Sequence, residues 1–272
     1  MPTEPAVAEN ITISPLAPEA PLPHAVLHHL YATMLRARLL EQRLRSAVHT
    51  GEAILAGTLQ NAEATDVIVS ATAHSVLEAL RGTEVDALLR GNNEGSEGRV
   101  VIAEEKIFAG IASGLATAGR RNQSNWVVVA FAPGRLTRGS SFEKATRFAA
   151  SHRLPLVILA DFTDSRRSSR NHDGRNLSHW PFPTIAVDGR DVIAVYRVTR
   201  EAINAARRGH GPTLVDCVNF LAPGSRGRDQ RDPLLSYRGY LQRHNAWSDL
   251  WHSDLLSRYK QELGARGRRQ KP

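Results

Sequence analysis

Two uninterrupted apolar runs constrain the fold of this chain more than any other feature of its sequence. Residues 126–131 read Trp-Val-Val-Val-Ala-Phe, and residues 156–160 read Leu-Val-Ile-Leu-Ala. Runs that are apolar throughout, rather than at every second position, are typical of strands in a parallel sheet covered on both faces. Residues 140–152 between them have the pattern of a helix. The segment 126–160 therefore predicts a strand–helix–strand unit.

Shorter patterns of the same two kinds extend through the rest of the chain. Apolar runs predict further strands, at residues 100–102, 185–188 and 213–220. Helical spacing of apolar residues predicts helices, over residues 27–48, 63–90, 107–118, 191–207 and 234–263. Small residues in one of these helices, among them Gly110 and Gly114, suit tight packing against a neighbour. The predicted fold class is α/β, with a parallel sheet sandwiched between helices.

The domain organisation follows from length and local composition. A chain of 272 residues fits one large domain or two small ones. Residues 1–23 are rich in Pro, Ala and Glu, which predicts a disordered N-terminal arm. We expect the α/β domain to span residues 24–233, followed by C-terminal helices over 234–263 and a basic tail over 264–272.

The cysteine content and the hydropathy pattern exclude several classes of protein. The single cysteine, Cys217, excludes an intrachain disulfide framework and a Cys-rich zinc module, and its place in a predicted strand predicts a buried, inert thiol. The longest uncharged stretch, residues 20–35, is too short and too polar for a membrane span. No basic start followed by an apolar block marks a secretory signal. We therefore expect a cytoplasmic protein that makes no contact with a membrane.

The charge balance leaves a nucleic-acid-binding protein as one alternative. The net charge is +8, but residues 258–272 alone hold six basic residues and one Glu. A basic protein of this kind would use residues 166–170 and this tail, and its affinity would fall steeply with salt. Charge without a recognition motif is weak evidence, so nucleic acid is not the partner that we expect.

The candidate site lies where the predicted strands end. In an open parallel sheet, ligands bind at the carboxyl ends of the strands, which here means the loops after Phe131, Ala160 and Phe220. The first loop, residues 132–139, leads a glycine into a helix, and its backbone N–H groups are suited to hold a phosphate. It matches no P-loop and no Gly-x-Gly-x-x-Gly fingerprint. The alternative is an ordinary turn, with Gly134 at a special dihedral angle.

Seven segments resemble those of one known family, in the same order and through most of the chain. They are residues 31–41, 60–64, 127–134, 148–155, 187–196, 211–215 and 231–234. Residues 60–64 resemble a Gly-Gln-Glu-Ala helix start, and residues 127–134 resemble a strand followed by a Gly-Asp-Gly turn. The chain is similar to the alpha subunit of the thiamine diphosphate-dependent 2-oxo acid dehydrogenases, the E1 component of pyruvate or branched-chain complexes.

This resemblance implies a fold, a reaction and partners. The fold would be the thiamine diphosphate-binding fold, and the reaction would be oxidative decarboxylation of a 2-oxo acid with acyl transfer to lipoyl. The implied cofactors are thiamine diphosphate and Mg²⁺. The implied partners are an E1 beta-type subunit, which supplies the carboxylate that activates the cofactor, and a lipoyl-bearing E2, in a homo- or hetero-oligomer. The candidate cofactor-binding residues are Gly134, Arg135, Asp161 and Thr163.

The chain departs from the family at the cofactor site. Pro133 stands where the family has the Asp of Gly-Asp-Gly, and Phe162 stands where it has an Asn ligand. Leu221 and Ser225 replace the family's Arg and the His of Gly-His-Ser, and the Tyr-Arg-x-His motif is missing between residues 64 and 100. Magnesium prefers oxygen ligands, which neither Pro nor Phe supplies. We therefore predict a degenerate alpha-subunit homologue with impaired or lost cofactor binding and a structural or regulatory role, and assign it no catalytic and no metal-binding residue.

One further alternative keeps the enzyme active through remodelled contacts. Arg135 and Arg138 would then pair with the phosphates without a metal, or Asp161 and Thr163 would bind Mg²⁺. The basic loop 166–170 is interpreted as a solvated loop or as a contact for an anion or a partner.

Overall fold

The computed structural model describes residues 22–44, 51–71, 74–89, 99–162, 180–218 and 232–265. In this part of the chain, six parallel strands form one sheet in the order β2-β1-β3-β4-β6-β5. The strands are β1 (Val67–Ser70), β2 (Val100–Ile102), β3 (Val128–Pro133), β4 (Leu156–Asp161), β5 (Thr184–Asp188) and β6 (Thr213–Val218). The predicted α/β class with a parallel sheet is confirmed.

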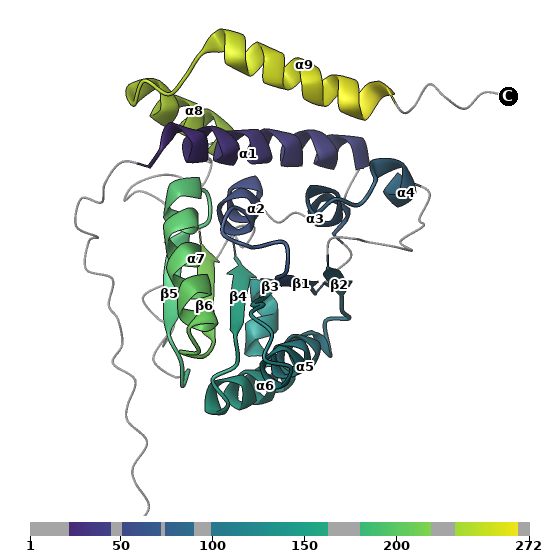
Figure 1. The fold of residues 1–272 in the computed structure, drawn as a ribbon, viewed down its shortest axis with the longest axis vertical. Helices are drawn as coiled ribbons and strands as arrows, with labels where there is room; N and C mark the ends of the chain where they lie inside the picture. The colour runs from purple at the N-terminus through teal and green to yellow at the C-terminus, as the bar shows by residue number, and fades with distance from the viewer. Residues whose placement is uncertain are drawn as a thin grey trace, which may run out of the picture.

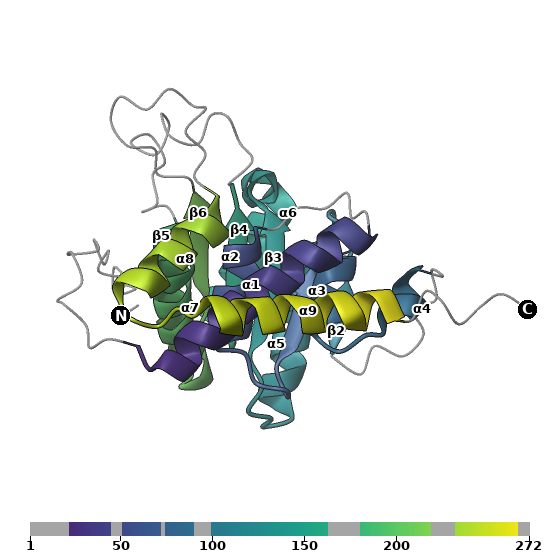
Figure 2. The same ribbon diagram turned by 90° about the horizontal axis from the view of Figure 1, so that it is seen from above.

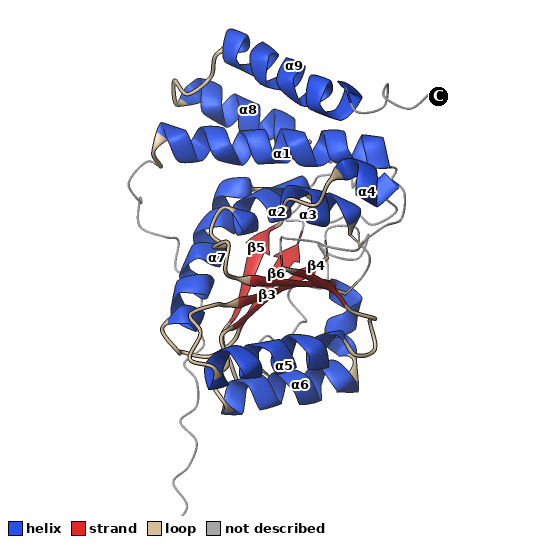
Figure 3. Ribbon diagram, turned by 45° about the vertical axis from the view of Figure 1, so that its right-hand side comes forward, coloured by secondary structure: helices blue, strands red, loops and turns tan. Residues whose placement is uncertain are grey.

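Helices cover both faces of the sheet (Figures 1 and 3). One face packs against α5 (Phe108–Arg121) and α6 (Ser140–Ser151), which follows the short 3-10 helix η1 (Gly134–Arg138). The other face packs against α2 (Glu52–Leu59), α3 (Ser75–Leu80) and α7 (Val192–Arg207), with α4 (Val85–Leu89) beside them. None of the described helices is long and apolar enough to span a lipid bilayer.

This two-sided cover explains why the central strands lack a polar face. Val128 and Ala130 of β3 belong to the core beneath α5 and α6, whereas Val129 and Phe131 belong to the core on the opposite side. Successive side chains of a strand point to opposite faces, so both sets are buried. The continuous apolar runs of β3 and β4 are the direct consequence.

A third layer lies outside α2 and α3. It consists of α1 (His24–Leu44), α8 (Pro233–Arg243) and α9 (Asp249–Ala265), and Figure 2 shows α9 crossing over α1. Arg38 of α1 donates to both carboxylate oxygens of Asp232 at 2.8 Å and also pairs with Glu52. Asp232 in turn caps α8, because its Oδ1 accepts from the N–H of Leu234 at 2.9 Å. These contacts join the start of α8 to helices α1 and α2.

The sequence interpretation is wrong for residues 63–90, which it placed in one helical stretch. Val67–Ser70 forms strand β1, buried between β2 and β3, and only the short helices α3 and α4 follow it. An apolar run of four residues does not distinguish a strand from a buried helix by periodicity. The expected helix start at residues 60–64 is also wrong, because α2 ends at Leu59 and a turn follows.

Other expectations fall on residues that the structure does not describe. These are the arm over residues 1–21, the end of the first predicted helix over 45–50, most of the loop after β4 over 163–179, the segment 219–231 and the tail over 266–272.

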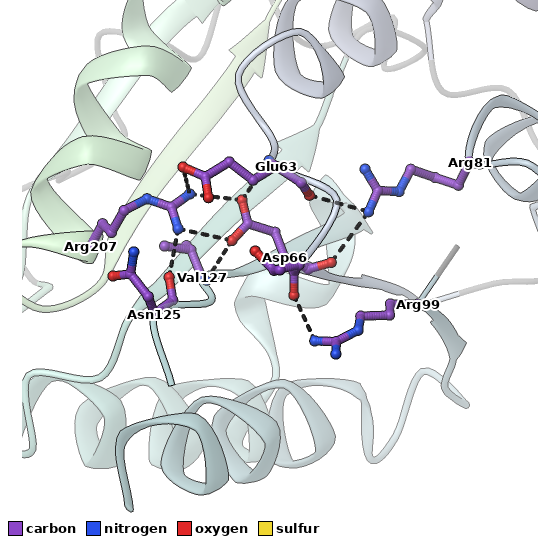
Figure 4. A network of polar contacts seen from close by, with 8 residues as sticks. Glu63, Asp66, Arg81, Arg99, Asn125, Val127 and Arg207 are labelled. Atoms are coloured by element: carbon purple, nitrogen blue, oxygen red, sulfur yellow. Dashed lines mark hydrogen bonds and ion pairs between the residues drawn. The ribbon is translucent and has the colours of Figure 1, made fainter. Parts of the chain in front are cut away.

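The strands β1 and β3 are fixed at their amino ends by a fully buried carboxylate (Figure 4). Asp66 Oδ1 accepts from the N–H of Val127 at 2.7 Å, and Oδ2 accepts from the N–H of Glu63 at 2.8 Å. Arg207 of α7 donates to both oxygens, at 3.2 and 2.9 Å, and to the carbonyl of Asn125 at 2.6 Å. The network joins residues 63–66, residues 125–127 and helix α7 at the amino ends of the strands, whereas a ligand is expected at their carboxyl ends. It therefore serves the fold.

Candidate cofactor site at the carboxyl edge of the sheet

The structure brings two of the three predicted loops together. In the parallel pairing of β3 and β4, Pro133 lies opposite Asp161, so Gly134 and Phe162 follow side by side. Strand β6 adjoins β4, with Cys217 opposite Asp161. The third loop, after Phe220, lies outside the described residues.

The loop after β3 has the predicted form, because Gly134 opens the 3-10 helix η1 and α6 begins at Ser140. Thr137 Oγ1 donates to the Gly134 carbonyl at 2.9 Å and closes the turn. Gly134 is not among the glycines with positive φ, so the predicted special dihedral angle is wrong. The glycine is required instead by the side chain that packs against it, which is Phe162.

The ring of Phe162 lies directly against Gly134. A Cβ atom built on Gly134 would lie 2.1 Å from Phe162 Cδ1 and 2.2 Å from Cε1. No real Cβ tolerates such a contact, so only glycine fits under the ring. The space beside the Cα atom of Gly134 is therefore filled by an aromatic side chain.

Phe162 is part of a larger aromatic core. Its side chain is 6% exposed and belongs to the same buried cluster as Phe142, Trp180 and Phe182. The rings of Phe142 and Trp180 meet edge to face with centroids 5.6 Å apart, and Trp180 lies 5.6 Å from Phe182. The Phe162 N–H donates to the Cys217 carbonyl at 2.8 Å, which holds the backbone in place. The carboxyl end of β4 therefore leads into the apolar core.

The two candidate phosphate-pairing arginines lie on η1 at the surface. The Arg135 guanidinium pairs with Glu105, which lies just before α5, and 63% of the Arg135 side chain is exposed. Arg138 is also exposed. Arg135 thus already has a carboxylate partner, in an exposed pair of a kind that contributes little to stability.

Three acidic residues lie near Cys217 toward the carboxyl ends of β4, β5 and β6, of which Asp216 is buried and Asp161 and Asp188 are half-buried. The thiol is fully buried, and burial raises its pKa well above the ordinary value, as do the nearby carboxylates of Asp161, Asp216 and Asp188. Burial also raises the pKa of Asp188, whose Oδ1 accepts from the N–H of Arg190 at 3.0 Å. The predicted burial of Cys217 is confirmed, and burial of this kind favours the protonated thiol over the reactive thiolate.

The predicted site residues are thus only partly assembled. Gly134 directly follows β3, and Asp161 is the last residue of the adjacent strand β4. Arg135 pairs with Glu105, and Thr163 lies outside the described residues. Within the part of the chain that the structure describes, no group of three or more His, Cys, Asp or Glu side chains is placed to hold a metal ion. The sequence interpretation missed the contact between Phe162 and Gly134, although an aromatic residue at an expected ligand position was a signal for it.

These residues do not fit thiamine diphosphate with Mg²⁺. A diphosphate needs backbone or cationic donors within reach, and its metal needs oxygen ligands. At the two positions that the resemblance assigns to metal ligands stand Pro133 and Phe162, and the Phe162 ring packs against the Cα atom of Gly134. We therefore derive no reaction step through this cofactor.

Comparison with known proteins finds alpha subunits of 2-oxo acid dehydrogenases among the proteins that this chain resembles. It is 31% identical to the 2-oxoisovalerate dehydrogenase subunit alpha of Bacillus subtilis over 169 residues, which are 53% of this chain and 51% of that protein. It is 33% identical to the 3-methyl-2-oxobutanoate dehydrogenase subunit alpha of Mycobacterium tuberculosis over 171 residues, or 55% and 47% of the two chains. The pyruvate dehydrogenase E1 component subunit alpha of Staphylococcus aureus is 24% identical over 177 residues, or 57% and 48%.

The match therefore spans about half the length of these curated relatives. The model of the family described as "Dehydrogenase E1 component" matches residues 44–271, which include the whole sheet and the C-terminal helices. This chain belongs to the dehydrogenase E1 component family, whose members depend on thiamine diphosphate.

Proposed function

We propose that this chain is a non-catalytic alpha-subunit homologue, which has lost the binding of thiamine diphosphate and Mg²⁺ and acts as a structural or regulatory subunit. The observation that carries this proposal is the Phe162 ring seated on Gly134. The neighbouring Pro133 contributes no carboxylate.

The cost of opening the site supports the loss of binding. A diphosphate at Gly134 would require Phe162 to leave its apolar surroundings, which include Trp180. Removing a buried Phe side chain from a core typically costs about 3–5 kcal/mol. Since about 1.4 kcal/mol corresponds to a tenfold change in affinity, this displacement alone would weaken binding by two to three orders of magnitude. Of the two arginines on η1, Arg135 already pairs with Glu105, which reduces its ability to offset that cost.

The proposed partner is an E1 beta-type subunit, in a hetero-oligomer that also meets a lipoyl-bearing E2. The relatives are named as alpha subunits, and the family match covers residues 44–271, which include the sheet and the C-terminal helices. A subunit that is retained for assembly would keep its fold while its cofactor site changed. We place this role in the cytoplasm, as the sequence leads us to expect.

The alternative of an active enzyme with remodelled contacts has less support. One route uses Arg135 and Arg138 for the phosphates, and Arg135 already pairs with Glu105. The other route binds Mg²⁺ through Asp161 and Thr163, and Thr163 lies outside the described residues. Of the basic segments needed for nucleic-acid binding, residues 166–170 and 266–272 lie outside the described residues.

The proposal is tested by mixing the purified chain with a beta-type subunit and measuring both mass and turnover. We expect a complex by light scattering and no decarboxylation of branched-chain or pyruvate-type 2-oxo acids. The Bacillus subtilis alpha subunit with its own partner serves as the positive control for turnover. Turnover by the mixture would contradict the loss of catalysis, and failure to form a complex would contradict the proposed partnership.

A further inference from the structure

A hollow of about 450 Å³ lies between the outer helices α1 and α9, which cross one another in Figure 2. Near one end of the hollow the ring of His28 stacks on Trp251, with centroids 4.2 Å apart, and His28 Nε2 donates to the Ala246 carbonyl at 2.8 Å. Near the other end Arg36 donates to Glu262 at 2.8 Å. The volume lies within the range of about 300–1,000 Å³ that is typical of sites for small molecules.

The wall that α9 contributes is aromatic at both ends and apolar in the middle. Trp251, Leu255 and Tyr259 line the hollow and follow one another at intervals of four residues, which brings them to one side of the helix. Eight residues separate the two aromatic side chains, a rise of about 12 Å. On α1, Ala32 lines the hollow one turn after His28. Its small side chain leaves the space open.

The hollow carries a cation that none of the described residues neutralises. Arg258 of α9 lines the hollow and is exposed, and no residue in the described part of the chain forms an ion pair or a hydrogen bond with it. The acidic residue in the lining, Glu262, already pairs with Arg36. His28 and His29 supply the rest of the polar lining. This balance favours an anionic ligand over a cationic one.

The hydroxyl of Tyr259 adds a hydrogen-bond donor to the same lining. Burial raises the pKa of Tyr259 above its ordinary value of 10.0, and Glu262 acts in the same direction, whereas the charges of Arg36 and Arg258 lower it. The hydroxyl therefore keeps its proton at neutral pH and can donate it in a hydrogen bond. Because Arg258 acts on this hydroxyl and lines the same hollow, one carboxylate can contact both groups.

We propose that the hollow between α1 and α9 binds a small aromatic carboxylate. The ring of the ligand lies over Leu255, between the side chains of Trp251 and Tyr259, where contacts between rings add to the burial of apolar surface. Its carboxylate accepts from the Arg258 guanidinium, whose N–H groups match the two oxygens, and from the Tyr259 hydroxyl. Since the ligand is small and the hollow is open to solvent, we expect a dissociation constant of about 0.1–1 mM.

The charge and the shape of the hollow select this class of ligand over others. One uncompensated cation matches a single carboxylate, whereas a diphosphate needs several donors, and the backbone N–H groups along the sides of two helices are already bonded within them. Residues 266–272, which follow α9 in the sequence, hold four basic and no acidic side chains, so they do not suit a cationic hollow. An aliphatic ligand leaves both aromatic side chains without a ring contact.

This inference goes beyond the proposed function and does not rest on it. The hollow lies between the outer helices, whereas the candidate cofactor site lies at the carboxyl edge of the sheet. Binding of an aromatic carboxylate can therefore be measured on the full chain alone, whether or not the chain binds thiamine diphosphate or a beta-type subunit.

The first test is saturation-transfer NMR on the full chain with 3-phenylpropanoate, followed by a titration. We expect saturable binding with a dissociation constant below about 1 mM. Two matched probes separate the parts of the ligand, because 3-phenylpropylamine keeps the ring and reverses the charge, and propanoate keeps the carboxylate and lacks the ring. Each should bind at least about tenfold more weakly. No saturable binding of 3-phenylpropanoate up to about 10 mM would overturn the proposal, as would equal binding of the amine or tighter binding of pyrophosphate.

Variants in the lining locate the binding. Arg258→Gln removes the cation and should raise the dissociation constant of 3-phenylpropanoate about three- to tenfold. The matched control is Lys260→Gln, which removes an exposed cation of the same helix that does not line the hollow and should leave binding unchanged. Ala32→Leu fills the hollow and should abolish binding. Circular dichroism checks that each variant folds. Normal binding by a folded Ala32→Leu variant, or equal effects of Arg258→Gln and Lys260→Gln, would overturn the proposal.

Discussion

The ring of Phe162 occupies the space in which any side chain on Gly134 would lie, with Cδ1 only 2.1 Å from the position of a Cβ atom. The two residues follow strands β3 and β4, which are paired in register. The carboxyl edge of a parallel sheet is where a ligand is expected. In this chain an aromatic core extends to that edge, and this is the basis of the proposed loss of cofactor binding.

Replacing the glycine should expose this contact directly. Gly134→Ala forces its Cβ into the Phe162 ring, and overpacking of this kind costs about 1–3 kcal/mol of unfolding free energy. Denaturation by urea measures the loss. The control is Gly110→Ala, where the added Cβ meets open space and the helix gains up to about 1 kcal/mol. Equal effects of the two substitutions would contradict the close contact.

Removing the ring should destabilise the protein strongly. Phe162→Ala takes a buried side chain out of the aromatic cluster, and we expect a loss of about 3–5 kcal/mol in unfolding free energy. The matched variant Phe148→Ala removes a ring that is 45% exposed on α6 and should cost less than about 1 kcal/mol. A small effect at Phe162 would show that its ring does not belong to the core.

The carboxylate of Asp66 should be the most sensitive polar group at the amino edge of the sheet. Asp66→Asn leaves Arg207 without its buried partner, and breaking such a pair typically costs about 3–5 kcal/mol. Glu63 also pairs with Arg207, at 3.3 Å, but its side chain is 57% exposed. The control Glu63→Gln should therefore change the unfolding free energy by less than about 1 kcal/mol. Similar losses in both variants would contradict the structural role of the buried carboxylate.

Acid should loosen the outer helices through Asp232. The hydrogen bond from Arg38 lowers the pKa of this carboxyl below its ordinary value of 3.8, and the N–H groups of Leu234 and Leu235 act in the same direction. A carboxyl with a lowered folded pKa stabilises the fold above its ordinary pKa. That contribution is lost as the pH falls through the folded pKa. Unfolding free energies below pH 4 should therefore fall less steeply for Asp232→Asn than for the wild type. An unchanged pH dependence would contradict this assignment.

The central sheet is well predicted from the sequence because the residue types in its strands reflect how each strand is buried. The runs at β3 and β4 are apolar at every position, as is typical of strands buried on both faces. Likewise, Asp191 precedes α7 as an N-cap and accepts from two backbone N–H groups, so the start of that helix is visible in the sequence.

Other features depend on contacts between distant residues, which periodicity does not reveal. Strand β1 is only four residues long, so its apolar run fits a stretch of buried helix equally well. The small residues of α5 were expected to pack against a neighbour. Ser113 and Ala116 do so, while Gly110 and Gly114 face solvent. The reason for Gly134 lies in Phe162, which follows a different strand. The departures from the family at Pro133 and Phe162 were visible, but the filling of the site by an aromatic ring needed the structure.

The central claim is tested most directly by calorimetric titration of thiamine diphosphate with Mg²⁺ into the full chain, alone and together with a beta-type subunit. The Bacillus subtilis alpha subunit with its partner provides the positive control under the same conditions. The account predicts no detectable binding to this chain in either preparation, up to about 1 mM cofactor. Binding in the low micromolar range that requires Mg²⁺ would contradict the account, and would mean that the Phe162 side chain moves away from Gly134.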